Sequence, residues 1–188
     1  MSYPILFGTM AAVSSGSQTS LGDMDPLITQ YVSSTQSGTV SSISFNNIPQ
    51  TYQHLQIRGV GYFSTANNPL MRFNGDTGSN YSWHHAWTNG SSGNNYNYGT
   101  SQTFMYVGYA DSANQPVTFW IDIFDYRNIY KNKSIKAIHA GETNGGSGET
   151  ALWSGTWRNK ASAVTSIQLL PGGGTFTAGT MLSLYGVK

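Results

Sequence analysis

Apolar and polar residues alternate over short stretches along most of the chain, and Gly, Asn, Asp and Ser separate these stretches. In the stretch SISF, for example, Ile43 and Phe45 alternate with serine. A period of two is typical of β-strands that bury one face. Strands are predicted at 41–46, 54–62, 70–73, 81–87, 103–109, 117–124, 134–140, 151–157, 164–170 and 181–185.

Helical periodicity is missing from the sequence, because Gly, Asn or Ser interrupts every window that could form an apolar helix face. Two polar tracts, TNGSSGNNYNYGTS at 88–101 and TNGGSGE at 143–149, are predicted to be loops. Long connections between short strands favour a jelly roll over a simple meander. We therefore predict an all-β protein: an antiparallel, jelly-roll-like β-sandwich over 31–188, with an extended N-terminal arm over 1–30 for attachment.

The composition agrees with one β-rich domain and restricts its partners. The chain has 188 residues, which is enough for a single domain with a full core. Its 9 Lys and Arg and 8 Asp and Glu give a net charge of +1, and only 9% of residues are charged. This balance offers no electrostatic surface for nucleic acid or anionic lipid. The 22 glycines and 13% aromatic residues instead favour turns, strands and stacked surfaces.

Several kinds of chemistry and targeting find no support in the sequence. There is no cysteine, so disulfides and thiolate chemistry are excluded, and no cofactor is predicted. The first residues, MSYPILFGTMAAVSSG, lack the basic segment of a signal peptide and the long apolar run of a membrane span. We expect synthesis in a cytoplasm, without a cleavable signal and without membrane insertion.

The stretch FNGDTGSNYSWHH at 73–85 suggests either a metal loop or a turn. A calcium loop needs several oxygen ligands at alternate positions, and here Asp76 has only weaker candidates beside it. Asn, Asp and Gly tolerate left-handed backbone, which favours a turn. The adjacent His84 and His85 would point to opposite faces of a strand, one to solvent and one beside Trp83 and Trp87, so no metal site is predicted.

Acid–base catalysis has one candidate pair, Asp122 and Asp125 in FWIDIFDYR. Glycosidases need two carboxylates across a sugar, but residues three apart in a strand face opposite sides. Asp125 is expected to form an ion pair with Arg127 near the strand end. No catalytic residues are predicted, and we expect a protein that is not an enzyme.

The aromatic residues suggest a sugar-binding surface. Aromatic faces stack on the C–H groups of sugar rings, and amide side chains bind sugar hydroxyls. Trp153 and Trp157 in ALWSGTW are predicted to be anchors of the core or of a subunit interface. The candidate glycan contacts are Trp87, Asn94, Asn95, Tyr96 and Tyr98.

Four stretches together resemble a group of small virion proteins of tailed bacteriophages. They are SISFNNIPQTYQHLQIR at 42–58, RFNGDTGSNYS at 72–82, LWSGTW at 152–157 and SIQLLPGGGTFTAGTMLSLYGVK at 166–188. The resemblance covers roughly residues 31–188. It implies a β-sandwich on the outside of a phage particle, commonly as an oligomer, with FNGDTGSNYS as a strand–turn–strand element. It brings no set of catalytic residues.

The sequence thus leads to two main hypotheses about function. The first is a non-enzymatic capsid decoration or cement protein on the virion exterior. It would be made in the host cytoplasm and would form a homotrimer bound to the major capsid protein or other virion proteins. The second is a receptor-binding tip of a tail fibre or baseplate, whose loops bind a host surface glycan. A weaker third hypothesis is a glycan-cleaving enzyme that uses Asp122 or Asp125.

Overall fold

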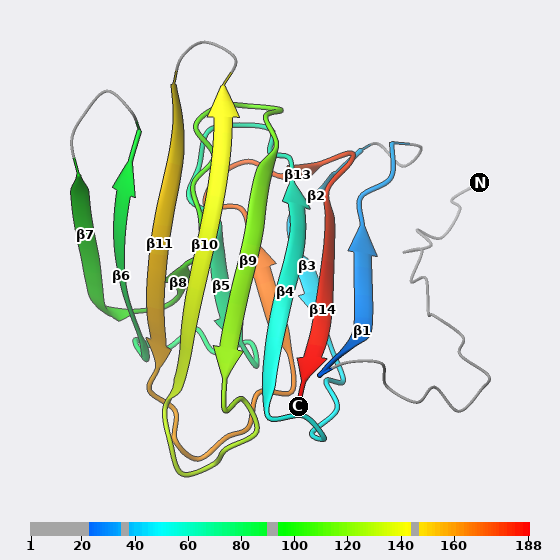
Figure 1. Cartoon of the computed structure of the whole chain (residues 1–188), viewed down its shortest axis with the longest axis vertical. Coiled ribbons are helices and arrows are strands. Elements are labelled where there is room, and N and C mark those ends of the chain that lie inside the picture. The colour runs from blue at the N-terminus through cyan, green and yellow to red at the C-terminus, as the bar shows by residue number, and fades with distance from the viewer. Residues whose placement is uncertain (1–22, 35–37, 90–93, 144–146) are drawn as a thin grey trace.

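A computed structural model describes residues 23–34, 38–89, 94–143 and 147–188, and within them the chain forms strands and connections without a helix (Figure 1). The all-β prediction is therefore confirmed. The strands are β1 Met24–Tyr31, β2 Thr39–Val40, β3 Ile43–Phe45, β4 His54–Gly61, β5 Leu70–Phe73, β6 Tyr81–Thr88, β7 Asn95–Gln102, β8 Met105–Tyr106, β9 Val117–Phe124, β10 Lys133–Thr143, β11 Ser147–Trp157, β12 Ile167–Leu170, β13 Phe176–Thr177 and β14 Met181–Val187.

Two antiparallel sheets form a sandwich. Within the described ranges the large sheet has eight strands in the order β1-β14-β4-β9-β10-β11-β6-β7. The small sheet has four, in the order β3-β12-β5-β8, and lies behind the large sheet in the view of Figure 1. Strands β2 and β13 pair separately. The sandwich is as predicted, whereas the jelly-roll connectivity stays a prediction.

The core lies between the sheets because the strands alternate as predicted. Along β9, VTFWIDIF, every second residue from Val117 to Ile123 is buried, and the residues between them face outward. The facing small sheet contributes its own alternate residues, as in β3, where Ile43 and Phe45 are buried. The largest buried side chains include Phe45, Phe63, Phe73, Tyr81, Tyr126, Trp153, Trp157 and Phe176.

The described parts of the two predicted loops are mostly strand, and for these parts the loop prediction was wrong, whereas 90–93 and 144–146 lie outside the described residues. The tract 88–101 contains most of β7, which pairs with β6 at the edge of the large sheet. Most side chains of β7 are polar and exposed, so no apolar alternation marks this strand in the sequence. The tract 143–149 overlaps β10 and β11, which pair as far as Thr143 and Ser147. The long connections that favoured a jelly roll are thus shorter than expected.

The predicted arm at 1–30 ends in a strand of the sheet. Strand β1 pairs with β14 at the other edge, so the sheet begins before the predicted domain boundary at residue 31. The register shifts between Pro26 and Ile28. An edge strand tolerates proline, which lacks a backbone N–H, and this proline obscured the strand in the sequence. The rest of the predicted arm, 1–22, lies outside the described residues.

The stretch FNGDTGSNYS is a turn between two strands, as predicted. Strand β5 ends at Phe73, and β6 begins at Tyr81. Asn74 and Gly75 have φ angles of 51° and 66°, in the left-handed region that Asn and Gly tolerate. The oxygens of Asp76 accept hydrogen bonds from the chain itself, including one from the Gly78 N–H at 2.8 Å.

Two glycines with positive φ differ in the space around them, which gives a test of the packing between β4 and β14. A Cβ on Gly59 would lie 2.0 Å from the carbonyl oxygen of Met181 in β14, whereas a Cβ on Gly75 would meet nothing within 4 Å. Gly59→Ala should lower the free energy of unfolding by about 2–3 kcal/mol, because the strands must separate. Gly75→Ala should cost about 1 kcal/mol. Urea unfolding measures both, and equal losses would contradict this explanation.

Candidate functional site

A pocket of about 360 Å³ lies on the inner side of the large sheet, next to strand β8 of the small sheet. It occupies the region of β6, β7 and β11, on the side of Figure 1 where the large sheet reaches beyond the small one. Its wall combines aromatic rings with amides and carboxylates. The lining residues are Asn68, Trp83, His85, Trp87, Asn89, Asn97, Tyr106, Tyr109, Asp111, Gly148, Glu149 and Trp153.

The aromatic wall follows from the alternation within WHHAW on β6. Trp83, His85 and Trp87 are two residues apart and therefore share the inner face of the sheet. The His85 ring lies between two indoles, with its centroid 4.3 Å from that of Trp87 and 3.8 Å from that of Trp153. Trp83 and Trp153 are buried, whereas His85 and Trp87 are half-buried. The half-buried Trp87 thus offers aromatic surface to a ligand, whereas the ring of His85 is covered by the two indoles.

Tyr106 of β8 completes this wall from the small sheet. Its ring packs edge-on against Trp83, with a centroid distance of 4.9 Å. On the neighbouring strand β7, Gly99 leaves room for the indole of Trp83, since a Cβ on Gly99 would lie 2.6 Å from that indole. The wall is therefore fixed by strands of both sheets, which favours a preformed site.

Two carboxyl groups, Asp111 and Glu149, lie at the acidic end of the pocket. Burial and then the nearby charge of Asp111 raise the pKa of Glu149 to about 7. The hydroxyl of Tyr109 lies 3.4 Å from Oδ1 of Asp111, to which it donates a hydrogen bond. At neutral pH Glu149 can therefore offer the pocket a partly protonated carboxyl group.

Buried His139 connects the aromatic wall to Glu149. The indole N–H of Trp153 donates to Nδ1 of His139 at 2.9 Å. Because an indole can only donate, Nδ1 carries no proton and the neutral ring carries it on Nε2. Nε2 lies 3.5 Å from Oε1 of Glu149, a polar contact slightly longer than an ordinary hydrogen bond. Burial, followed by the charge of His85, lowers the pKa of His139 to about 4, so this neutral tautomer persists at neutral pH.

His85 also stays neutral, and one of its nitrogens has no protein partner. Burial lowers the pKa of His85 to about 4. Its Nδ1 is buried without a hydrogen-bond partner among the described residues, and so is Nε1 of Trp83. Buried polar atoms are rarely unsatisfied, so two of them in one pocket wall point to a site built for something other than stability.

The raised pKa of Glu149 predicts a pH-dependent difference between the wild type and Glu149→Gln. A carboxyl whose pKa is raised on folding binds protons more tightly in the folded state, so it destabilises the fold as the pH rises from about 4.5 to about 7. Glutamine does not ionise. We therefore expect Glu149→Gln to gain stability relative to the wild type between pH 5 and pH 8, measured by urea unfolding.

The stability difference between the wild type and Glu149→Gln separates the contribution of Glu149 to the pH dependence from the contributions of the histidines. The lowered pKa values of His85 and His139 act in the opposite direction, because their stabilisation is lost as the pH falls from about 6.5 to about 4. Both histidines are present in the two proteins, so their contributions largely cancel in the difference. A difference that is constant between pH 5 and pH 8 would contradict the assignment to Glu149.

The sheet divides the predicted glycan contacts between two faces. Trp87 lines the pocket, and Asn95 lies opposite Trp87 in the register of β6 and β7. Tyr96 and Tyr98 pair with Ala86 and His84, which share the outer face, and both tyrosines are exposed. Asn94 precedes β7 and is exposed. The five residues therefore do not form one binding surface.

The histidine prediction is confirmed in its arrangement. His84 faces solvent and stacks on Tyr98 at a centroid distance of 5.7 Å, whereas His85 packs beside tryptophans. Trp153 and Trp157 are both 1% exposed and belong to the core of the chain itself. Trp153 has a second role that the core prediction missed, because its edge lines the pocket.

Asp122 and Asp125 have separate structural partners. On the outer face, Asp122 forms an ion pair with Nζ of Lys136 at 2.9 Å. Partial burial alone would raise the pKa of Asp122, but hydrogen bonds from Gln56, Lys136 and Trp120 outweigh it and lower the pKa. This carboxylate is therefore held in its ionised form by the sheet.

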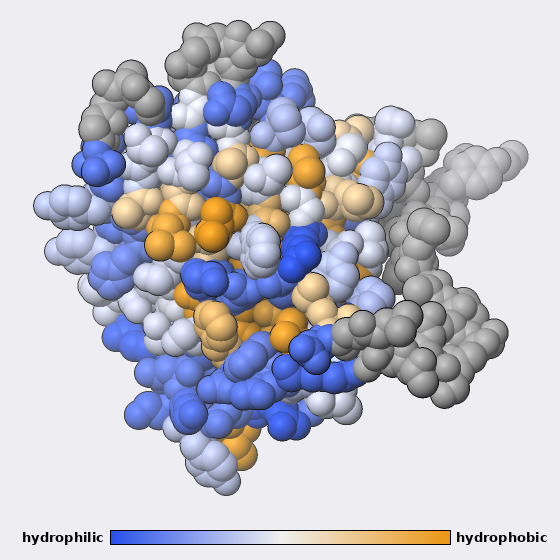
Figure 2. Space-filling view, viewed as in Figure 1, coloured by the Kyte–Doolittle hydropathy of each residue, from blue (hydrophilic) through white to orange (hydrophobic). Residues whose placement is uncertain are grey.

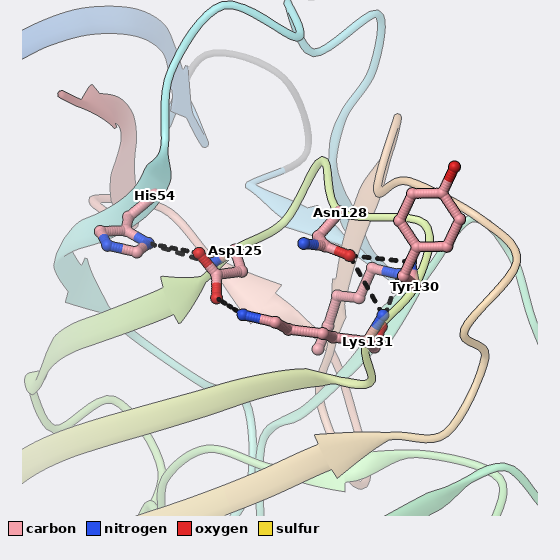
Figure 3. Close-up of polar contacts among 6 residues, drawn as sticks. His54, Asp125, Asn128, Tyr130 and Lys131 are labelled. Atoms are coloured by element: carbon pink, nitrogen blue, oxygen red, sulfur yellow. Dashed lines mark hydrogen bonds and ion pairs between the residues drawn. The ribbon is translucent and has the colours of Figure 1, made fainter.

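Asp125 belongs to a polar cluster at the end of β9 (Figure 3). Its carboxylate lies 3.6 Å from Nζ of Lys131, and its backbone N–H donates to Nδ1 of His54 at 3.0 Å. Asn128 Oδ1 accepts the N–H groups of Tyr130 and Lys131, which fixes the turn. The predicted ion pair with Arg127 was wrong, because the Arg127 guanidinium donates to the carbonyl of Gln50.

The pocket residues that the sequence-based reasoning missed include Asp111, Glu149, Tyr106 and Tyr109. Glu149 lay in a tract predicted to be a loop, and its inward direction depends on the register of the β10–β11 hairpin. The alternation of WHHAW was the one available signal, since it places three rings on one face. Strand pairing was needed to bring Trp153 beside them.

Across the described residues, no group of three or more His, Asp or Glu side chains is arranged to hold a metal ion. In the same ranges, no helix has the length and apolarity to cross a membrane. Comparison with known proteins found no match: no protein-family model, no curated protein and no solved structure matched this chain.

Proposed function

We propose that this chain is a non-enzymatic glycan-binding protein of a phage particle, and that it binds its glycan in the pocket between β6, β11 and β8. The observation that carries the proposal is the aromatic wall of Trp87, His85 and Trp153, next to Asp111 and Glu149. Aromatic faces beside amides and carboxyl groups suit sugars, whose rings have apolar C–H faces and a rim of hydroxyls.

The pocket chemistry indicates which glycans would bind. No Lys or Arg is among the lining residues within the described chain, while two carboxyl groups are. Acidic sugars and phosphorylated sugars are usually bound by Arg or Lys, and here they would meet carboxylates instead. The proposed ligands are therefore neutral sugars. The volume of about 360 Å³ lies at the low end of small-molecule sites, so a terminal sugar or a short branch would fill it.

The virion location is supported by the resemblance of RFNGDTGSNYS and the C-terminal stretch to phage virion proteins. Glycan binding fits the receptor-binding hypothesis better than the capsid decoration hypothesis, because decoration requires a surface for the capsid and has no need of a sugar pocket. Localisation of the chain in purified particles separates the two. Density at the tail tip supports receptor binding, whereas density on the capsid shell would support decoration.

A glycan array tests the binding proposal. We expect neutral glycans to be bound, acidic glycans to be rejected, and the bound glycans to be recovered intact. Because single sugar sites are often weak, the protein should be displayed at high avidity. Absence of binding to neutral glycans would contradict the proposal. Cleavage of a glycan by the wild type that is lost in Glu149→Gln would instead make the site catalytic, since glycosidases also use a pair of carboxyl groups, one of which has a raised pKa.

A further inference from the structure

The outer face of the large sheet carries two lateral rows of side chains that are almost free of charge. The first row, called here the Trp120 row, runs across all eight described strands of the sheet: Thr29, Ser183, Arg58, Trp120, Ile138, Leu152, Ala86 and Tyr96. The second, the Met181 row, runs beside it: Tyr31, Met181, Val60, Thr118, Ala140, Thr150 and Thr88. Arg58 is the one charged residue of the two rows.

Large apolar side chains are concentrated on this face. Trp120, Ile138, Leu152, Met181 and Tyr31 are between 44% and 53% exposed. Of the exposed large hydrophobic side chains in the described residues, all but Ile129 and Tyr130 lie on this face. Figure 2, which looks onto the large sheet, shows apolar colour across its middle. Contiguous apolar surface of this kind on a folded domain usually marks an interaction site.

The charged side chains at the centre of this face have partners within the chain. The guanidinium of Arg58 lies 4.4 Å from the centroid of the Trp120 ring. In the adjacent row, Lys136 pairs with Asp122, which also accepts a hydrogen bond from Trp120 Nε1 at 3.1 Å. A highly charged partner would find little complementary charge along these two rows. An apolar, self-neutralised surface is instead complementary to another copy of itself.

The size of the face is close to what such a contact needs. Neighbouring strands lie about 4.8 Å apart, and residues on the same face of one strand lie about 7 Å apart. The two rows and the adjacent polar row, taken across the width of the sheet, therefore cover roughly 700 Å². A stable interface buries about 800 Å² on each partner. Two copies could also associate edge to edge by pairing their β1 strands. This alternative is poorer, because Pro26 and the register shift interrupt the row of backbone N–H groups at that edge.

We propose that two copies of this chain pack face to face through the outer surface of the large sheet, with Trp120, Ile138 and Leu152 at the centre of the interface. An isologous contact closes at two copies. This face therefore gives a dimer, whereas the sequence-based hypothesis gave a trimer. The pocket lies on the opposite side of the same sheet, so both copies keep their pockets open.

Sedimentation velocity over a wide range of protein concentration tests the proposal. We expect a dimer for the wild type, and we expect Leu152→Lys and Ile138→Lys to raise the dissociation constant about 30-fold or more, because each places a charge at the centre of the contact. Both side chains are exposed in the single chain, so the substitutions leave the core intact. The matched control is Tyr130→Lys, since Tyr130 is 82% exposed and lies off this face.

Circular dichroism and thermal unfolding should show that the variants fold, and the milder Leu152→Thr provides a second variant if they do not. A wild type that stays monomeric at all concentrations would overturn the proposal. An oligomer of any size that is unchanged in Leu152→Lys and Ile138→Lys would overturn it as well. Glycan binding per chain should be the same in these variants, which separates a failure of this interface from a failure of the pocket.

Discussion

Replacing Trp157 with alanine is expected to lower the free energy of unfolding by about 3–5 kcal/mol, a large part of the stability of a single domain. Trp157 is 1% exposed and packs against Phe73 and Tyr81, at centroid distances of 5.6 Å and 6.4 Å. Its indole N–H donates to Oδ2 of Asp76 at 2.7 Å. One residue thus joins the end of β11, the β5–β6 turn and the core, and alanine would remove all three contacts.

Urea unfolding of Trp157→Ala, Trp157→Phe, Asp76→Ala and the double variant Asp76→Ala/Trp157→Phe separates packing from hydrogen bonding. Trp157→Phe keeps an aromatic ring but removes the indole N–H. Asp76→Ala leaves that buried N–H without its acceptor and should cost about 1–3 kcal/mol. The double variant should cost less than the sum of the two single variants. Additive losses would contradict the coupling between the turn and Trp157.

Acidification gives a second check on Asp76. Partial burial would raise its pKa, but hydrogen bonds from Trp157, Asn80 and Gly78 outweigh it, so the folded-state pKa is lowered. The stabilisation is therefore complete above the unfolded pKa and is lost as the pH falls through the folded pKa. The stability difference between the wild type and Asp76→Ala should shrink on acidification.

Replacing Trp87 with alanine is expected to weaken glycan binding about tenfold or more, which corresponds to about 1.4 kcal/mol or more. Trp87 is half-buried, lines the pocket and packs against the His85 ring at a centroid distance of 4.3 Å. In Trp87→Ala, a sugar packed on this wall would lose one of the aromatic rings that contact it. Because Trp87 lies near the end of β6, the fold should tolerate the change. Isothermal titration calorimetry with a glycan found on the array measures the effect.

Tyr96→Ala and Tyr98→Ala are the matched controls for Trp87→Ala. Both tyrosines belong to the neighbouring strand β7 and are 84% and 62% exposed, but they face the outer side of the sheet. Their replacement should leave the affinity unchanged. Weaker binding in Tyr96→Ala and Tyr98→Ala with normal binding in Trp87→Ala would place the sugar on the outer face and contradict the pocket.

The fold could be predicted from the sequence wherever strands bury one face. Strand β9 occupies the predicted range 117–124, because its apolar residues alternate without interruption. Strands β1 and β7 were missed because both are edge strands. An edge strand needs little apolar alternation, so Pro26 in β1 and the Asn-rich sequence of β7 were taken for an arm and a loop.

The candidate site could be predicted only in part. The sequence predicted an aromatic binding surface that includes Trp87, since the spacing of the tryptophans in WHHAW is visible without a structure. It could not show that Tyr96 and Tyr98 face away from Trp87, because that depends on where β7 begins. Nor could it bring Asp111 and Glu149 together, because they are far apart in sequence and meet only through the pairing of the strands.

The five tryptophans of the chain allow the most direct test of glycan binding in the pocket. The indole N–H signals can be followed by ¹⁵N NMR while a neutral oligosaccharide is added to the wild type. Binding in the pocket predicts shifts for Trp83, Trp87 and Trp153, with Trp120 on the outer face and Trp157 in the distant core unchanged. A shift of Trp120 alone, or no shift with any neutral glycan, would contradict the proposed function.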